Sequence, residues 1–381
     1  MKGYIYMEEL KIIEVKTKNE RKEFVEYPLR LYKNNPYFVP PLYSDEMNLF
    51  TDKNIYKRTC DNAFFLAKRG KKTVGRIQGI IQRQYNEIHK TTQARFTRFD
   101  CEDNLETAKA LFTAVETWAK ENKMSHVVGP LGYSDLEREG LLVEGFDYLA
   151  TFEEQYNYAY YGALVENCGY VKDVDWLEHR IFSCKQDFVR FDNILKHTLK
   201  KYNLHFGDKT LPKRKFINKY KDGIFYCLDE CYKDLYGTVP FTEEMKKQII
   251  DQFMLFIDVK YISVVLDENE EVVAFGFCLP GLGEAVQKSG GRLTIPCIMR
   301  LLKTLKKPRV IDFALVGIMP KYRNTGLTAF MMTVLKELFE EDSIEYMETN
   351  LNLEDNVSIR SLWKRFEHIQ HKRRRSYVKY L

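Results

Sequence analysis

Three consecutive segments decide the fold of this chain: Val310-Ile-Asp-Phe-Ala-Leu-Val-Gly-Ile-Met319, Pro320-Lys-Tyr-Arg-Asn-Thr-Gly-Leu-Thr328 and Ala329-Phe-Met-Met-Thr-Val-Leu-Lys-Glu-Leu-Phe339. The first is β-branched and aromatic, and the third carries apolar residues at helical spacing. This pattern predicts a strand, a loop and a helix. The first turn of such a helix leaves backbone N–H groups unpaired, and the aligned peptide dipoles favour negative charge there. With Arg323 and Gly326 in the loop, the junction is a candidate phosphate site.

The loop Arg323-Asn324-Thr325-Gly326-Leu327-Thr328 resembles the pyrophosphate loop of the GNAT acyltransferase superfamily, whose pattern is Arg or Gln, two residues, Gly, one residue, and Gly or Ala. The resemblance implies that the loop amides hold the pyrophosphate of acetyl-CoA or another acyl-CoA. It also implies that the preceding strand, with Val316 and Ile318, pairs with the pantetheine arm. Thr328 stands where the family has Gly or Ala. The alternative is a basic loop that only serves packing, because short motifs often match by chance.

Length and composition restrict the class of protein. A chain of 381 residues predicts two domains of ordinary size, and 45% hydrophobic residues are enough for packed cores. No apolar run is long enough to span a membrane, and the N-terminus lacks a secretory pattern, so we expect a soluble, cytoplasmic protein. Eight cysteines without a Cys-x-x-Cys pair indicate reduced thiols and no metal site. A net charge of +5 gives no strong case for nucleic acid.

The order of predicted elements resembles the GNAT topology in both halves of the chain. The sequence therefore predicts an α/β protein of two tandem GNAT-like domains, each a mixed, mostly antiparallel sheet flanked by helices. We place the first domain at residues 1–185 and the second at residues 186–381. The run from Tyr236 to Glu244 and the run from Glu348 to Asn356 resemble tandem GNAT-like bacterial proteins of unassigned substrate.

The first half differs from the second at the corresponding loop. Residues 100–104, Asp-Cys-Glu-Asp-Asn, are acidic and contain no glycine, so they repel a pyrophosphate and predict a first domain without acyl-CoA binding. Residues 129–147 are a glycine-punctuated, charged loop, which we interpret as a salt-bridged surface or domain-interface loop in preference to a substrate cleft. The basic run His371-Lys-Arg-Arg-Arg-Ser376 alternates with apolar residues and favours a final edge strand over a phosphate contact.

Acyl transfer to an amine needs a base, donors for the developing oxyanion, and an acid for the leaving thiolate. Glu348, near the end of a predicted strand, is our candidate base, and a strand-end salt bridge is the alternative. Asn356 resembles the family's later motif, in which it caps a helix and reaches the pantetheine amide. Trp363 stands where the family has a Tyr acid, and an indole N–H cannot serve as that acid. Tyr322 in the loop is the substitute candidate.

The sequence leads to one leading function and two alternatives. The leading function is an acyl-CoA-dependent N-acyltransferase that moves an acetyl or longer acyl group to a small-molecule amine of unknown identity. The first alternative is a non-catalytic protein that binds or senses acyl-CoA. The second is an aminoacyl-tRNA-dependent transferase whose basic tail binds RNA.

Overall fold

The computed structural model describes residues 8–182, 188–254, 256–340 and 343–381. The chain forms two compact units, which we call unit 1 and unit 2. Unit 1 comprises Met1–Leu177, Gly283–Ile298 and His371–Leu381, and unit 2 comprises Glu178–Leu282 and Met299–Gln370. The expected domain boundary near residue 185 lies outside the described residues. Both units contain residues from each side of that boundary.

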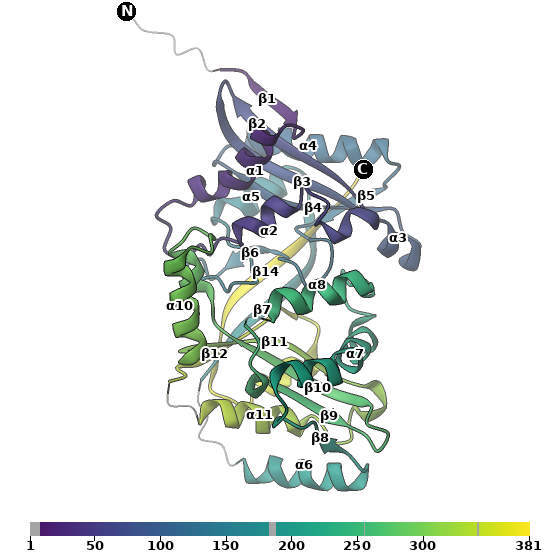
Figure 1. Ribbon diagram of the computed structural model, residues 1–381. Helices are drawn as coiled ribbons and strands as arrows, with labels where there is room; N and C mark the ends of the chain where they lie inside the picture. The colour runs from purple at the N-terminus through teal and green to yellow at the C-terminus, as the bar shows by residue number, and fades with distance from the viewer. Residues whose placement is uncertain (1–7, 183–187, 255, 341–342) are drawn as a thin grey trace, which may run out of the picture. The chain divides into compact units, whose positions relative to one another are not determined.

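Unit 1 contains a sheet, the helices packed on it and a short helix from the second half of the sequence (Figure 1). Its strands are β1 (Leu10–Glu14), β2 (Cys60–Arg69), β3 (Lys72–Gln82), β4 (Gln93–Cys101), β5 (His126–Gly129) and β6 (Leu141–Glu144). Its helices are α1 (Lys18–Leu31), α2 (Tyr43–Asn48), η1 (Ile55–Arg58), α3 (Arg83–His89), α4 (Leu105–Glu121), α5 (Tyr160–Asn167) and α9 (Gly283–Gln287).

Unit 2 repeats this order of elements in broad outline. Its strands are β8 (His205–Phe206), β9 (Ile262–Leu266), β10 (Val272–Pro280), β11 (Val310–Ile318), β12 (Tyr346–Thr349) and β13 (Asn352–Leu353). Its helices are α6 (Val189–Lys201), α7 (Lys213–Tyr232), α8 (Glu243–Phe253), η2 (Val259–Tyr261), η3 (Pro320–Tyr322), α11 (Ala329–Phe339) and α12 (Val357–Trp363). Three elements contain residues of both units, namely β7 (Val171–Ile181), α10 (Ile295–Lys306) and β14 (His368–Tyr380).

Each unit has a mixed, mostly antiparallel sheet with one parallel pair among its described strand pairings. In unit 1, β1 to β4 are antiparallel neighbours, and β4 then runs parallel to β5. In unit 2, β8 to β11 are antiparallel neighbours, and β11 then runs parallel to β12. Helix α4 packs on β2 and β3, and helix α7 packs on β10 and β11 (Figure 1). The predicted fold class is confirmed.

Local sequence explains the helices that cover these sheets. Asn104 caps the N-terminus of helix α4, because its side chain accepts a hydrogen bond from Thr107 N at 2.9 Å. Its buried residues recur at helical spacing, from Ala108 through Leu111 to Val115. Helix α11 is apolar on most sides and lies in the core of unit 2. Among the described residues, no helix combines the length and apolar character needed to cross a membrane.

Two sequence interpretations need correction. The charged segment 129–147 contains a strand, β6, and Glu139 within it is only 3% exposed, so it is not merely a surface loop. The final strand is not at an edge, because β14 pairs with β5 through Tyr377–Tyr380 and with β6 through Arg373–Arg375. Arg374 is fully buried there and lies 3.6 Å from Glu154. Alternation of charged and apolar residues resembled an edge strand because the buried charges have ionic partners.

Candidate functional site

The candidate site of unit 2 begins where β11 and β12 diverge. The two strands stay in parallel register from Val310 opposite Tyr346 to Phe313 opposite Thr349. Beyond this point a side chain replaces the ladder, since Asn350 Nδ2 donates to the carbonyl of Ala314 at 3.2 Å. A bulge between β10 and β11 at the same place changes the direction of the β11 backbone. The last residues of β11 therefore have an edge that none of the described strands covers.

Helix α7 supplies side chains to this edge of β11. The Tyr232 hydroxyl donates to the Val316 carbonyl at 3.1 Å, and the Val316 N–H donates to the same hydroxyl at 3.4 Å. Within a strand, the N–H and C=O of one residue point to the same side. Val316 was predicted to pair with pantetheine, and the structure shows that its polar groups are occupied by Tyr232.

Ile318, two residues further along β11, faces the same edge and is occupied in the same way. Its carbonyl accepts a hydrogen bond from Arg323 Nε at 3.3 Å, and its N–H donates to the sulfur of Cys231. The Arg323 side chain also donates to Cys231. The side chains of Tyr232, Arg323 and Cys231 therefore form hydrogen bonds with the backbone groups of β11 that the sequence analysis assigned to the cofactor.

Cys231 has an unusual environment for a thiol. Its sulfur lies 3.9 Å from that of Cys227, one turn earlier in α7. The hydrogen bond from Cys227 and the nearby Arg323 guanidinium lower the pKa of Cys231 to about 7, and the same coupling together with burial raises the pKa of Cys227. Cys231 is therefore the more acidic thiol of this pair.

The loop after β11 presents free backbone donors to solvent. Within the described part of the chain, the amides of Asn324, Gly326 and Thr328 donate no hydrogen bond. Asn324 and Gly326 have positive φ angles of 61° and 96°, and Asn324 and Thr328 are exposed. Thr328 precedes α11 without capping it by its side chain. Such a turn at a helix N-terminus suits an anion.

Helix α6 packs against the other side of this loop. Thr198 Oγ1 donates to the Thr325 carbonyl at 3.2 Å. A Cβ at Gly326 would lie 2.8 Å from Thr198 Oγ1 and 3.0 Å from Ile194 Cγ2. Packing against α6, as well as the φ of 96°, therefore requires glycine at this position. The glycine in the motif is not by itself evidence for a bound pyrophosphate.

Glu348 lies at the beginning of the divergence, on β12. It pairs in register with Asp312 on one side and with Arg180 of β7 on the other. It is 3% exposed, and its carboxylate lies 3.4 Å from Arg180 Nε. The predicted base is thus buried, and the strand-end salt bridge that was its alternative is also present. One does not exclude the other, because an ion-paired carboxylate still has oxygen lone pairs that can accept a proton.

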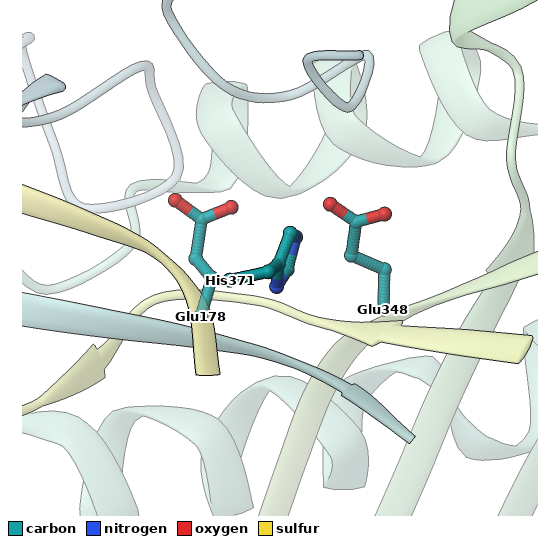
Figure 2. A group of neighbouring side chains, drawn as sticks. All are labelled: Glu178, Glu348 and His371. Carbon is teal, nitrogen blue, oxygen red and sulfur yellow. The ribbon is translucent and has the colours of Figure 1, made fainter. Parts of the chain in front are cut away.

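Two further titratable side chains lie near Glu348. Figure 2 shows Glu178 of β7, Glu348 of β12 and His371 of β14 with the imidazole between the two carboxyl groups. Each offers one ligand atom, and these atoms lie within 4.8 Å of one another. Two carboxylates and an imidazole are ligand types that divalent metals accept. The sequence analysis identified Glu348 but missed this group, because Glu178 is distant from the other two residues in the chain.

The other predicted site residues have structural contacts of their own. Tyr322 lies in the core of unit 2, with its ring 6.1 Å from that of Tyr202. Asn356 caps α12 through a hydrogen bond from Ile359 N at 3.2 Å. Trp363 is 1% exposed and donates from Nε1 to Asn352. Leu327 of the loop is fully buried. Cofactor contact by Asn356 and acid catalysis by Tyr322 stay predictions.

The corresponding junction of unit 1 is built differently. Only residues 102–104 separate β4 from α4, compared with residues 319–328 between β11 and α11. Asp100 points into the protein, where its carboxylate accepts from Arg76 at 2.8 Å and from Tyr32 at 2.9 Å. Burial raises the pKa of Asp100, and the Arg76 charge opposes that rise. Asp100, one of the acidic residues of the run 100–104, therefore has structural contacts, and the expected repulsion of pyrophosphate by this run stays a prediction.

Solved structures share this architecture. A tandem GNAT protein from the clavulanic acid biosynthesis pathway, solved without acetyl-CoA, matches 98% of this chain and 98% of its own chain, with a TM-score of 0.55 and 11% identity. The chain has the tandem GNAT fold. A GCN5-related glucosamine N-acetyltransferase region of a fungal multi-domain β-N-acetylglucosaminidase matches 98% of this chain and 38% of its own, with a TM-score of 0.54 and 12% identity. At these identities the likeness shows the tandem GNAT fold alone.

Two curated proteins resemble the chain over nearly its whole length. Protein YghO of Escherichia coli is 25% identical over 95% of this chain and 93% of its own length. A bacterial ceramide synthase of Caulobacter vibrioides is 27% identical over 98% of both chains. No protein-family model matches the sequence. The resemblance to both proteins includes both units of the tandem GNAT fold.

Proposed function

We propose that this protein is an acyl-CoA-dependent N-acyltransferase whose site lies in unit 2. The observation that carries the proposal is a buried carboxylate, Glu348, at the point where β11 and β12 diverge. The same divergence opens a strand edge that leads to the loop with free amides. A base, a strand edge for an extended arm and an anion site thus follow one another along one path.

Each part has a role in this reaction. The amides of Asn324, Gly326 and Thr328, with Arg323, hold the pyrophosphate of acyl-CoA. Val316 and Ile318 pair with the pantetheine arm after Tyr232 and Arg323 have moved away. Glu348 accepts a proton from the acceptor amine, and the amine nitrogen then attacks the thioester carbonyl. The C–S bond breaks, CoA leaves as a thiolate and takes a proton from solvent, and an amide is formed.

Arg180 has a positioning role in this scheme. Its guanidinium lies 3.4 Å from the Glu348 carboxylate and 4.3 Å from the centroid of the Tyr346 ring. Through this ion pair Arg180 holds the Glu348 carboxylate at the end of β12.

For the acceptor, we propose a long-chain amine of the sphingoid-base type, acylated in the cytoplasm. Support comes from the full-length resemblance to the bacterial ceramide synthase at 27% identity. Unit 1 binds no acyl-CoA in this proposal. Only residues 102–104 connect β4 to α4, which is shorter than the loop of unit 2, and the Asp100 carboxylate accepts a hydrogen bond from Arg76.

The first test measures the release of CoA thiol from a panel of acyl-CoAs, of two to eighteen carbons, with sphinganine and shorter amines as acceptors. Replacing the base should reduce the rate by about a hundredfold to ten-thousandfold. We therefore expect Glu348→Gln to lose nearly all activity and to keep its affinity for acyl-CoA in calorimetry. The control is Glu345→Gln, since Glu345 lies just before β12 in an exposed ion pair with Arg309.

Full activity of Glu348→Gln would remove Glu348 from the mechanism. If none of the acyl-CoAs shifts the melting temperature or binds in calorimetry, the acyl-CoA proposal itself fails.

A second candidate is an acyl-CoA sensor without turnover. Two observations favour it. Tyr232, Cys231 and Arg323 already form hydrogen bonds with the edge of β11. Trp363 also stands where the family has its acid. Binding of acyl-CoA without thiol release for any amine would favour the sensor.

A further inference from the structure

Helix α10 exposes an apolar face. Ile295, Ile298, Met299 and Leu302 are 77%, 41%, 67% and 55% exposed. Their spacing places them on one side of a helix with 3.6 residues per turn. Leu293, just before the helix, adds another exposed aliphatic side chain at 43%. Single exposed aliphatic residues are common on proteins, whereas a cluster of this kind marks an interaction surface.

The opposite side of α10 fixes the helix to the protein. Cys297 is fully buried, and its thiol lies 3.6 Å from the carbonyl of Ala285. Leu301, four residues later, is 2% exposed. The helix therefore has one face that packs and another that does not, and Figure 1 shows it as one continuous helix. The exposed face is a feature of a folded, anchored element.

The charge of this segment is one-sided. Residues 285–311 contain no Asp or Glu and seven basic residues, which are Lys288, Arg292, Arg300, Lys303, Lys306, Lys307 and Arg309. The whole chain has a net charge of only +5. Lys303 and Lys306 are exposed on or beside the apolar face, and among the described residues neither makes an ion pair. Three of the seven basic residues form ion pairs with acids outside the segment, namely Lys288 with Glu284, Arg292 with Glu26 and Arg309 with Glu345. The exposed aliphatic side chains together with Lys303 and Lys306 fit a negatively charged surface that also accepts apolar groups.

We propose that the exposed face of α10 binds the surface of an anionic lipid bilayer. The aliphatic side chains enter the boundary between headgroups and acyl chains, and the lysines contact the lipid phosphates. Nucleic acid would use the lysines and leave the aliphatic side chains in water. A second copy of the chain would bring two strongly basic faces together. A bilayer with anionic headgroups satisfies both features.

The test is sedimentation of the full chain with vesicles of phosphatidylglycerol and phosphatidylcholine in equal parts, compared with phosphatidylcholine alone. We expect binding to the anionic vesicles that weakens as salt is added. Met299→Gln/Leu302→Gln should reduce the bound fraction at least tenfold, and so should Lys303→Gln/Lys306→Gln/Lys307→Gln. All five side chains are exposed, and all but Lys307 lie on α10. The circular dichroism spectrum and the melting temperature should therefore stay unchanged.

The matched control is Lys22→Gln/Lys90→Gln/Lys120→Gln, which removes the same charge from exposed positions outside α10. It should bind vesicles like the wild type. Equal losses in both triple variants would show that net charge alone drives binding, and would overturn the assignment to α10. A dimer in the absence of lipid that Met299→Gln/Leu302→Gln converts to a monomer would also overturn it. Vesicle binding does not depend on acyl transfer, so its failure leaves the proposed function standing.

Discussion

At the scale of single residues, the most informative side chain is Cys231. Its sulfur receives hydrogen bonds from Cys227 and Arg323 and from the backbone of Ile318, and these lower its pKa to about 7. Burial raises the pKa of another thiol of unit 2, Cys278, to about 12. The reactivity of Cys231, which lies on α7 beside Ile318 at the end of β11, can therefore be used to follow the candidate cofactor edge.

The residue-scale prediction concerns alkylation of Cys231. The rate with iodoacetamide, followed by peptide mass spectrometry, should reach half its maximum near pH 7, because the thiolate forms above that pH. Arg323→Gln removes one cause of the lowered pKa and should shift the profile to higher pH. A saturating acyl-CoA should slow alkylation at least severalfold, since the arm would cover the Ile318 edge.

Cys278 provides the internal reference, because its thiol is buried and protonated over the same pH range. A Cys231 profile that rises only near pH 9 would contradict the geometry around the sulfur. Folding stability should depend on pH through the same group. Because folding lowers the pKa of the Cys231 thiol, its contribution to stability is fully present above about pH 9 and is lost as the pH falls through about 7.

At the scale of elements, the C-terminal turn of α7 closes the edge that β11 opens. Backbone groups at the end of a strand need partners, and Tyr232 supplies them for Val316. A cofactor arm that pairs with Val316 has to displace this hydroxyl. Helix α6 sets the second limit, because Thr198 and Ile194 lie against Gly326 of the loop.

The element-scale prediction follows from this competition. Tyr232→Phe removes the hydroxyl that occupies Val316, so acyl-CoA should bind about twofold to tenfold more tightly, which corresponds to one net hydrogen bond of about 0.5–1.5 kcal/mol. Calorimetry with a non-hydrolysable acyl-CoA measures it. The control is Tyr226→Phe, which removes a hydroxyl from an exposed residue of the same helix. Weaker binding by Tyr232→Phe would mean that the hydroxyl contacts the cofactor instead.

At the scale of the whole molecule, each unit is built from segments that are separated in the sequence. The last eleven residues, His371–Leu381, belong to unit 1, although more than a hundred residues of unit 2 precede them. Their strand pairs with β5 and β6, and it contributes the fully buried Arg374. Unit 1 is therefore incomplete until the end of the chain is available to it.

The whole-molecule prediction is that a chain ending at Gln370 fails to fold unit 1. Removal of residues 371–381 leaves β5 without a strand partner on one side. It also leaves the buried Glu154 without the charge of Arg374, and a buried uncompensated charge costs about 3–5 kcal/mol. Hydrogen exchange at Val127 and Val128 should become fast, and the calorimetric transition should broaden or split. Tyr380→Ser, at a 76% exposed position, should change the melting temperature very little. Native exchange rates in the shortened chain would contradict the role of β14.

Sequence patterns were sufficient wherever neighbours along the chain decide the structure. The strand, loop and helix from Val310 to Phe339 follow from periodicity and turn residues, and Asn356 caps its helix as a local side-chain rule predicts. The GNAT-like order of elements in each half was readable for the same reason. The confirmed fold class therefore rests on local signals that repeat twice in the chain.

The tertiary structure alone decided what surrounds the site. Only the folded chain brings Tyr232 and Cys231 to β11, Arg180 to Glu348, and α6 to Gly326. The sequence showed Cys227 and Cys231 one turn apart, yet it did not show Arg323 beside them. Pairings between distant segments depend on register and packing, which have no signature in neighbouring residues. By itself the sequence determined a twice-repeated GNAT-like chain with a phosphate-type loop, whereas only the tertiary structure showed that the strand beside that loop is already occupied.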